Sequence, residues 1–144
     1  MAHEHIVVCD DDYDTVDFLD LVLAECGYRV HVAHDAGEVM QGFEKTTPAC
    51  LVLDVHLPDH DGFWIAQQLR SSGVQVPIIF ITADTTPSCQ AAMGSIGGKV
   101  DVIIKPVYPY MLIEKVQIAV AHAYSSGMLK AVPSSDSQGG LQGL

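Results

Sequence analysis

The chain has 144 residues, of which 49% are hydrophobic and 17% charged, so its composition is that of one globular domain and excludes intrinsic disorder. Eighteen acidic and seven basic residues give a net charge of −11, which argues against direct binding to nucleic acid or to an anionic membrane. No apolar run is long enough to cross a membrane, residues 1–5 do not resemble a signal peptide, and the scattered cysteines form no CxxC pair. We therefore expect a cytoplasmic protein with reduced cysteines.

The first half of the chain alternates between strand and helix patterns. The continuous apolar run at residues 6–9 is typical of a parallel strand that is covered on both faces. Apolar residues then recur at helical spacing over residues 14–26. Residues 28–33 alternate apolar and polar side chains, which predicts an edge strand. Residues 35–45 begin with an aspartate that has an acid three positions later, and this pattern predicts a capped helix.

The second half repeats this alternation. Continuous apolar runs at residues 50–53, 77–81 and 102–104 predict three more buried strands. A helical segment over residues 63–72 separates the first two of these strands. Further helices are expected to begin near Pro87 and Pro109, because proline is favoured at the first helical position.

Five strand–helix units predict an α/β fold with a doubly wound, five-stranded parallel sheet. Right-handed crossovers favour the flavodoxin-like strand order 2-1-3-4-5. We expect residues 1–123 to form this domain. Residues 124–144 are rich in serine and glycine, which predicts a flexible tail or a linker. A linker would make the chain a fragment of a longer protein.

Chemically active side chains follow four of the predicted strands. Asp10 and Asp11 follow the first strand, Asp54 the third, Thr82 the fourth and Lys105 the fifth. The carboxyl ends of parallel strands meet at one edge of a sheet, so we expect these side chains to lie close together. Crowded carboxylates repel one another unless a cation intervenes, and Mg²⁺ prefers oxygen ligands. The sequence therefore predicts a magnesium site with a hydroxyl and an ammonium beside it.

The motifs around these residues make the chain similar to the response-regulator receiver domains of two-component signalling. The motifs are VCDDD at residues 8–12, LDVHLPDHDG at 53–62, ITA at 81–83 and KP at 105–106. The resemblance implies that Asp54 accepts a phosphoryl group from a histidine kinase or a histidine phosphotransfer protein. It also implies that the domain catalyses only its own phosphorylation and dephosphorylation and is otherwise not an enzyme.

The same resemblance assigns roles to individual residues. The implied Mg²⁺ ligands are Asp10, Asp11, Asp54 and the backbone carbonyl of His56. Thr82 and Lys105 are implied to contact the phosphoryl group through a hydroxyl and an ammonium. Asp84, two residues after Thr82, and His56, two residues after the acceptor, occupy positions that tune how long the phosphoryl group lasts. Many receivers have a cis peptide bond after their lysine, so we expect one between Lys105 and Pro106.

Signal output is implied to occur through protein contacts, on the face formed by the fourth helix, the fifth strand and the fifth helix. The partner on this face would be a downstream protein or a second copy in a homodimer. Receivers usually carry tyrosine or phenylalanine three residues before their lysine, and that side chain moves together with the threonine. Here the position is Val102, which puts a switch of that kind in question.

Two other function classes stay open. A phosphorylation-independent interaction module with a receiver fold is slightly favoured by Val102, whereas the intact acidic cluster argues against it. A phosphatase of the haloacid dehalogenase type would use Asp10 in an Asp-x-Asp motif. The short chain and the presence of Asp54 argue against this second alternative.

Overall fold

The computed structural model describes residues 3–130, in which five strands alternate with five helices. The strands are β1 (His5–Cys9), β2 (Arg29–Ala33), β3 (Cys50–Asp54), β4 (Ile78–Thr82) and β5 (Val100–Ile104). The helices are α1 (Tyr13–Glu25), α2 (Ala36–Lys45), α3 (Gly62–Ser71), α4 (Pro87–Gly94) and α5 (Pro109–Ser125). All neighbouring strands pair in parallel, in the order β2-β1-β3-β4-β5. The predicted fold class and strand order are confirmed.

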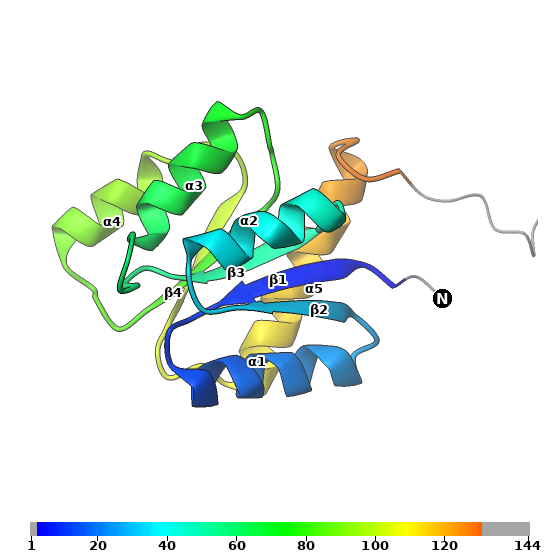
Figure 1. Ribbon diagram of the computed structural model, residues 1–144, viewed down its shortest axis with the longest axis horizontal. Helices are drawn as coiled ribbons and strands as arrows, with labels where there is room; N and C mark the ends of the chain where they lie inside the picture. Colours follow the sequence, from blue (N-terminus) through cyan, green and yellow to red (C-terminus); the bar gives the residue numbers. More distant parts are fainter. Residues whose placement is uncertain (1–2, 131–144) are drawn as a thin grey trace, which may run out of the picture.

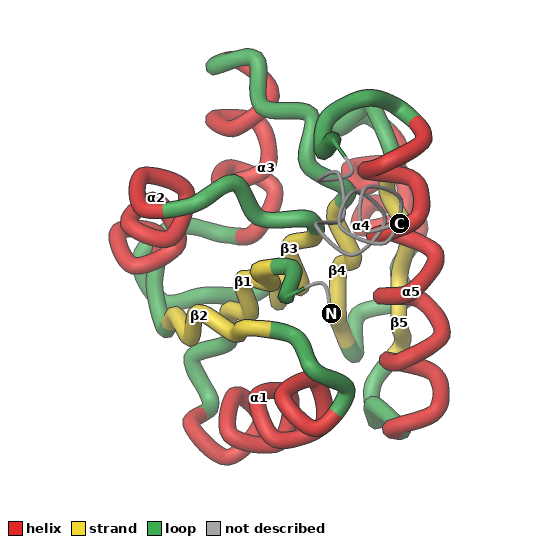
Figure 2. The backbone as a smooth tube through the Cα atoms, turned by 90° about the vertical axis from the view of Figure 1, so that its right-hand side faces the viewer, coloured by secondary structure: helices red, strands yellow, loops and turns green. Residues whose placement is uncertain are grey.

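The sheet has an apolar core on each face. Helices α1 and α5 pack on one face, and α2, α3 and α4 pack on the other; Figures 1 and 2 show α1 and α2 on opposite sides of the sheet. Within β1, Ile6 and Val8 face the α1–α5 side, whereas Val7 and Cys9 face the α2–α4 side. Because both faces are covered, successive residues of a strand are all buried, which explains the continuous apolar runs.

Side-chain caps fix the start of four of the five helices. The capping side chains are Asp12 for α1, Asp35 for α2, Asp61 for α3 and Thr86 for α4. Each accepts a hydrogen bond from a backbone amide in the first helical turn. Each of these four loops therefore runs from a strand end to a capped helix start, and the loops hold their polar side chains at one edge of the sheet.

Most predicted boundaries differ by one or two residues from those of the structure, and three of these differences bear on the account. Helix α3 begins at Gly62, and β5 begins at Val100. Helix α5 continues past residue 123 to Ser125, and Met128 packs against the core beyond it. The rest of the expected tail, residues 131–144, lies outside the described residues. Among residues 3–130, no helix is both long and apolar enough to cross a membrane.

Candidate functional site

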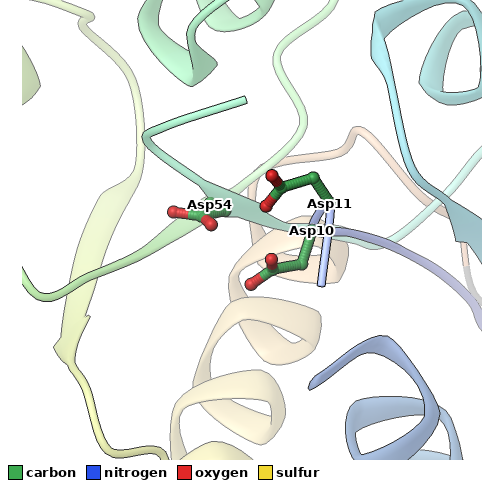
Figure 3. Close-up of side chains that lie close together, drawn as sticks. All are labelled: Asp10, Asp11 and Asp54. Carbon is green, nitrogen blue, oxygen red and sulfur yellow. The ribbon is translucent and has the colours of Figure 1, made fainter. Parts of the chain in front are cut away.

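Three carboxylates meet at the carboxyl-terminal edge of the sheet. Asp10 and Asp11 lie on the loop after β1, and Asp54 ends the neighbouring strand β3, as Figure 3 shows. Each offers one oxygen within 4.8 Å of the others. Asp10 is fully buried and Asp54 is 5% exposed, while Asp11 is exposed. The cluster therefore has a buried base and a side that is open to solvent.

Lys105 is the cation that contacts this cluster. Its Nζ lies 3.1 Å from Oδ2 of Asp10 and 3.3 Å from Oδ2 of Asp54. Burial lowers the pKa of Lys105, but the charges of Asp54 and Asp10 outweigh that effect, so the net shift is upward. Lys105 therefore stays positively charged. Its single positive charge does not balance the charges of three carboxylates, so the cluster as a whole is negative.

The charged form of the Asp10 carboxyl is disfavoured at this buried position. Burial raises the pKa of Asp10, and the charge of Asp54 raises it further, although the amide of Asp12 and the ammonium of Lys105 act in the opposite direction. The net shift is upward. A small divalent cation with oxygen ligands would remove this penalty, so the donor set fits Mg²⁺.

The loop after β3 fixes the carboxyl group of Asp54. The amide of His56 donates to Oδ1 of Asp54 at 3.2 Å, and the amide of Gly62 donates to the carbonyl of Val55 at 2.7 Å. A Cβ atom at Gly62 would collide with the carbonyl oxygen of Asp54. The loop can close this tightly over the strand end only because residue 62 is glycine.

Thr82 and Asp84 line the same edge from the next strand. Thr82 is fully buried at the end of β4, and its Oγ1 accepts a hydrogen bond from the amide of Asp84 at 2.9 Å. This bond uses Thr82 as an acceptor, so its hydroxyl proton is available to a further oxygen. Hydrogen bonds from Thr86 are the main cause of the lowered pKa of Asp84.

A contact between two loops was missed by the sequence analysis. Nε2 of His56 lies 3.2 Å from Oδ2 of Asp84, and this pair joins the loop after β3 to the loop after β4. The His56 side chain is 66% exposed, so the pair lies at the mouth of the site. His56 stands two positions after Asp54, the last residue of β3, and Asp84 stands two positions after Thr82, the last residue of β4. Because β3 and β4 are neighbouring parallel strands, residues at equal distances past their ends can meet. This equal spacing was the signal in the sequence for the contact.

The structure places Asp10, Asp11, Asp54, Thr82 and Lys105 at the same edge of the sheet, as predicted. Val102 lies away from this edge. Val102 pairs with Phe80 on β4 and packs, partly buried, against the core on the α2–α4 side. It contributes no polar group to the carboxylate cluster. The expected cis peptide bond between Lys105 and Pro106 is present.

Comparison with known proteins identifies the family that shares this arrangement. A family model described as "Response regulator receiver domain" matches residues 6–117. The response regulator protein GraR of Staphylococcus epidermidis is 31% identical over 123 residues, and GraR of Staphylococcus aureus is 32% identical over 119 residues. These matches cover 85% and 83% of this chain but only 54% and 52% of the relatives, so the chain spans about half their length.

A solved structure extends the comparison to the fold. The receiver domain protein (CheY-like) from Methanospirillum hungatei JF-1 superposes with a TM-score of 0.80 at 25% identity. The superposition covers 88% of this chain and all of that one. The comparisons confirm the resemblance that the sequence motifs indicated.

Proposed function

Because this chain belongs to the family of response regulator receiver domains, we propose that Asp54 accepts a phosphoryl group from a histidine kinase or a histidine phosphotransfer protein. The observation that carries this proposal is the convergence of Asp10, Asp54 and Lys105 at one edge of the sheet. A carboxylate can form an acyl phosphate. Asp10 and Asp54 each accept hydrogen bonds from a backbone amide and from Lys105, and of these two Asp54 is the one with some exposed surface.

The transfer step is a displacement at phosphorus. An oxygen of Asp54 attacks, the bond from phosphorus to the donor histidine breaks, and the imidazole leaves with its electron pair and takes up a proton. Lys105 stabilises the negative charge on the phosphoryl oxygens, and Thr82 donates its hydroxyl proton to one of them. Asp10, Asp11, Asp54 and the backbone carbonyl of His56 would hold Mg²⁺, which supplies a second positive charge at the same place.

The His56–Asp84 pair is proposed to set the lifetime of the phosphorylated state. Water must reach the phosphorus atom for hydrolysis, and this pair stands at the mouth of the site. Removing either side chain opens that mouth, and removing Asp84 also removes a negative charge near the phosphoryl group. We expect changed dephosphorylation rates in His56→Ala and in Asp84→Ala. Unchanged rates in both variants would contradict the assignment.

Output is proposed to use the face formed by α4, β5 and α5. Large apolar side chains are exposed there: Ile104 is 43% exposed, Tyr108 50%, Tyr110 70% and Ile118 49%. Such exposed apolar area favours a contact with a downstream protein or with a second copy. Val102 cannot supply the aromatic side chain of the usual switch, so the readout must use another change on this face.

The proposed compartment is the cytoplasm, where phosphodonor and receiver can meet. All four cysteines are free thiols in the structure, which supports a reducing compartment.

Phosphorylation is tested with acetyl phosphate and Mg²⁺, by looking for a single added phosphoryl group in the intact mass. The expected adduct is stable in acid and labile in base, as an acyl phosphate is. It should be lost in EDTA and in Asp54→Asn. The matched control is Asp17→Asn, which removes an exposed carboxylate of α1 and should leave the adduct in place.

Two outcomes would contradict the proposal. Failure of the wild-type chain both to form the adduct and to bind beryllofluoride with Mg²⁺ would favour a phosphorylation-independent module. Turnover of a phosphate ester that is lost in Asp10→Asn but kept in Asp54→Asn would favour the phosphatase.

A further inference from the structure

A groove of about 660 Å³ lies at the amino-terminal ends of the strands, at the opposite end of the sheet from the carboxylate cluster. Its walls come from the α2–β3, α3–β4 and α4–β5 connections and from the segment after α5. One residue from each of these walls, in the same order, is Thr47, Val74, Lys99 and Met128. In Figure 1 the ends of α2 and α5 lie on the same side as the N-terminus. The groove is therefore separate from the phosphorylation site.

The acids of the connecting segments gather at one end of the sheet. The loops that follow the strands hold the acids Asp10, Asp11, Asp12, Asp35, Asp59, Asp61 and Asp84. The segments that lead from each helix into the next strand hold none. The groove is lined by Lys99 and His122 and by no acid, although the chain has 18 acids and 7 Lys and Arg residues. Within residues 3–130, Lys99 forms no ion pair. The groove is thus a locally basic site on an acidic protein.

The groove also has an apolar lining that is held in place. Phe43, Val74, Val76 and Met128 contribute to it, and Val76 is fully buried. The guanidinium of Arg70 donates to the carbonyls of Val74 at 3.0 Å and Val76 at 2.7 Å. These bonds fix the α3–β4 wall and place a second positive charge behind it.

We propose that this groove binds a small organic anion with an apolar body, such as an aromatic carboxylate or sulfonate. The anionic group would pair with the ammonium of Lys99, and the apolar body would pack against Val74 and Met128, which are partly exposed. The groove lies within the range of about 300–1,000 Å³ that is typical of small-molecule sites. A mostly apolar lining with few charged groups is also typical of such sites.

The probe for this proposal is 8-anilinonaphthalene-1-sulfonate, added to the full 144-residue chain and followed by amide chemical shifts. We expect saturable shifts at Thr47, Val76, Lys99 and Met128. The dissociation constant of this sulfonate should be about fivefold higher for Lys99→Gln than for the wild type, because the variant loses one partly exposed ion pair with the ligand. Lys115→Gln is the matched control, because Lys115 pairs with Asp101 outside the groove, and it should bind as the wild type does.

The neutral analogue N-phenyl-1-naphthylamine separates the charge from the apolar body, because it lacks the sulfonate. It should bind more weakly than the sulfonate, and equally to the wild type and to Lys99→Gln. Lys99→Arg should keep the wild-type affinity for the sulfonate, which shows that the charge and not a folding defect is responsible. Shifts confined to another surface, or equal affinity for the two probes, would overturn the proposal.

Discussion

Replacing Asp10 by asparagine is expected to stabilise the metal-free protein, although the change removes an ion pair. An oxygen of Asp10 lies within 4.8 Å of an oxygen of Asp54 and of Asp11, and each repulsion amounts to about 3 kcal/mol at an effective dielectric constant of about 20. The attraction to Lys105 at 3.1 Å is about 5 kcal/mol on the same scale. These Coulomb energies largely cancel, so the burial of a charged carboxylate decides the sign.

The raised pKa of Asp10 gives the same sign. A carboxyl whose pKa is higher in the folded than in the unfolded state lowers stability at pH values where it is ionised in both. At neutral pH without metal, Asp10→Asn should therefore raise the free energy of unfolding by about 1 kcal/mol, or the melting temperature by about 3 °C. Asparagine keeps an oxygen that can accept the amide hydrogen bond of Asp12.

Thermal unfolding followed by circular dichroism, in EDTA and in Mg²⁺, tests this reasoning. Mg²⁺ should raise the melting temperature of the wild type, since a ligand that binds only the folded state stabilises it, and should have little effect on Asp10→Asn. Asp17→Asn removes an exposed charge from α1 and should behave as the wild type. A destabilised Asp10→Asn in EDTA, or equal stabilisation of both proteins by Mg²⁺, would refute the account.

Three further predictions concern the scaffold. Gly62→Ala should lower the free energy of unfolding, measured by urea titration, by about 2 kcal/mol, because the Cβ of the new alanine would collide with the carbonyl oxygen of Asp54. The control is Gly94→Ala, which has open space around it and should not destabilise the protein. Cys26 should react with iodoacetamide well before the other cysteines, which are buried and whose thiol pKa values burial raises; equal rates by peptide mass would contradict this. Arg70→Met should speed amide hydrogen exchange over residues 95–99, because it removes donors to the Gly97 and Lys99 carbonyls; unchanged protection there would argue against this tie.

The sheet and the site could be predicted because both follow from local patterns. A strand buried on both faces must be continuously apolar, as in residues 50–53, and the residue after it stands at the sheet edge. Asp10, Asp54 and Lys105 follow such runs, and their meeting is a consequence of parallel topology.

The boundaries and loop contacts that were missed depend on tertiary partners. The start of β5 was not predicted, because Asp101 interrupts the apolar pattern. Its carboxylate is partly exposed on this edge strand and pairs with Lys115 on α5 at 3.1 Å, so a charge is tolerated there. The His56–Asp84 contact joins residues 28 positions apart. Helix α3 begins at Gly62 because Asp61 caps it, and the sequence offered several acids near that point.

The most direct test of the central claim is to locate the phosphoryl group after phosphorylation with acetyl phosphate and Mg²⁺. Borohydride reduces an acyl phosphate of aspartate to homoserine, which peptide mass spectrometry identifies at a single position. The account predicts homoserine at position 54 only. Homoserine at position 10 instead, with Asp54 unmodified, would contradict the assignment of the acceptor.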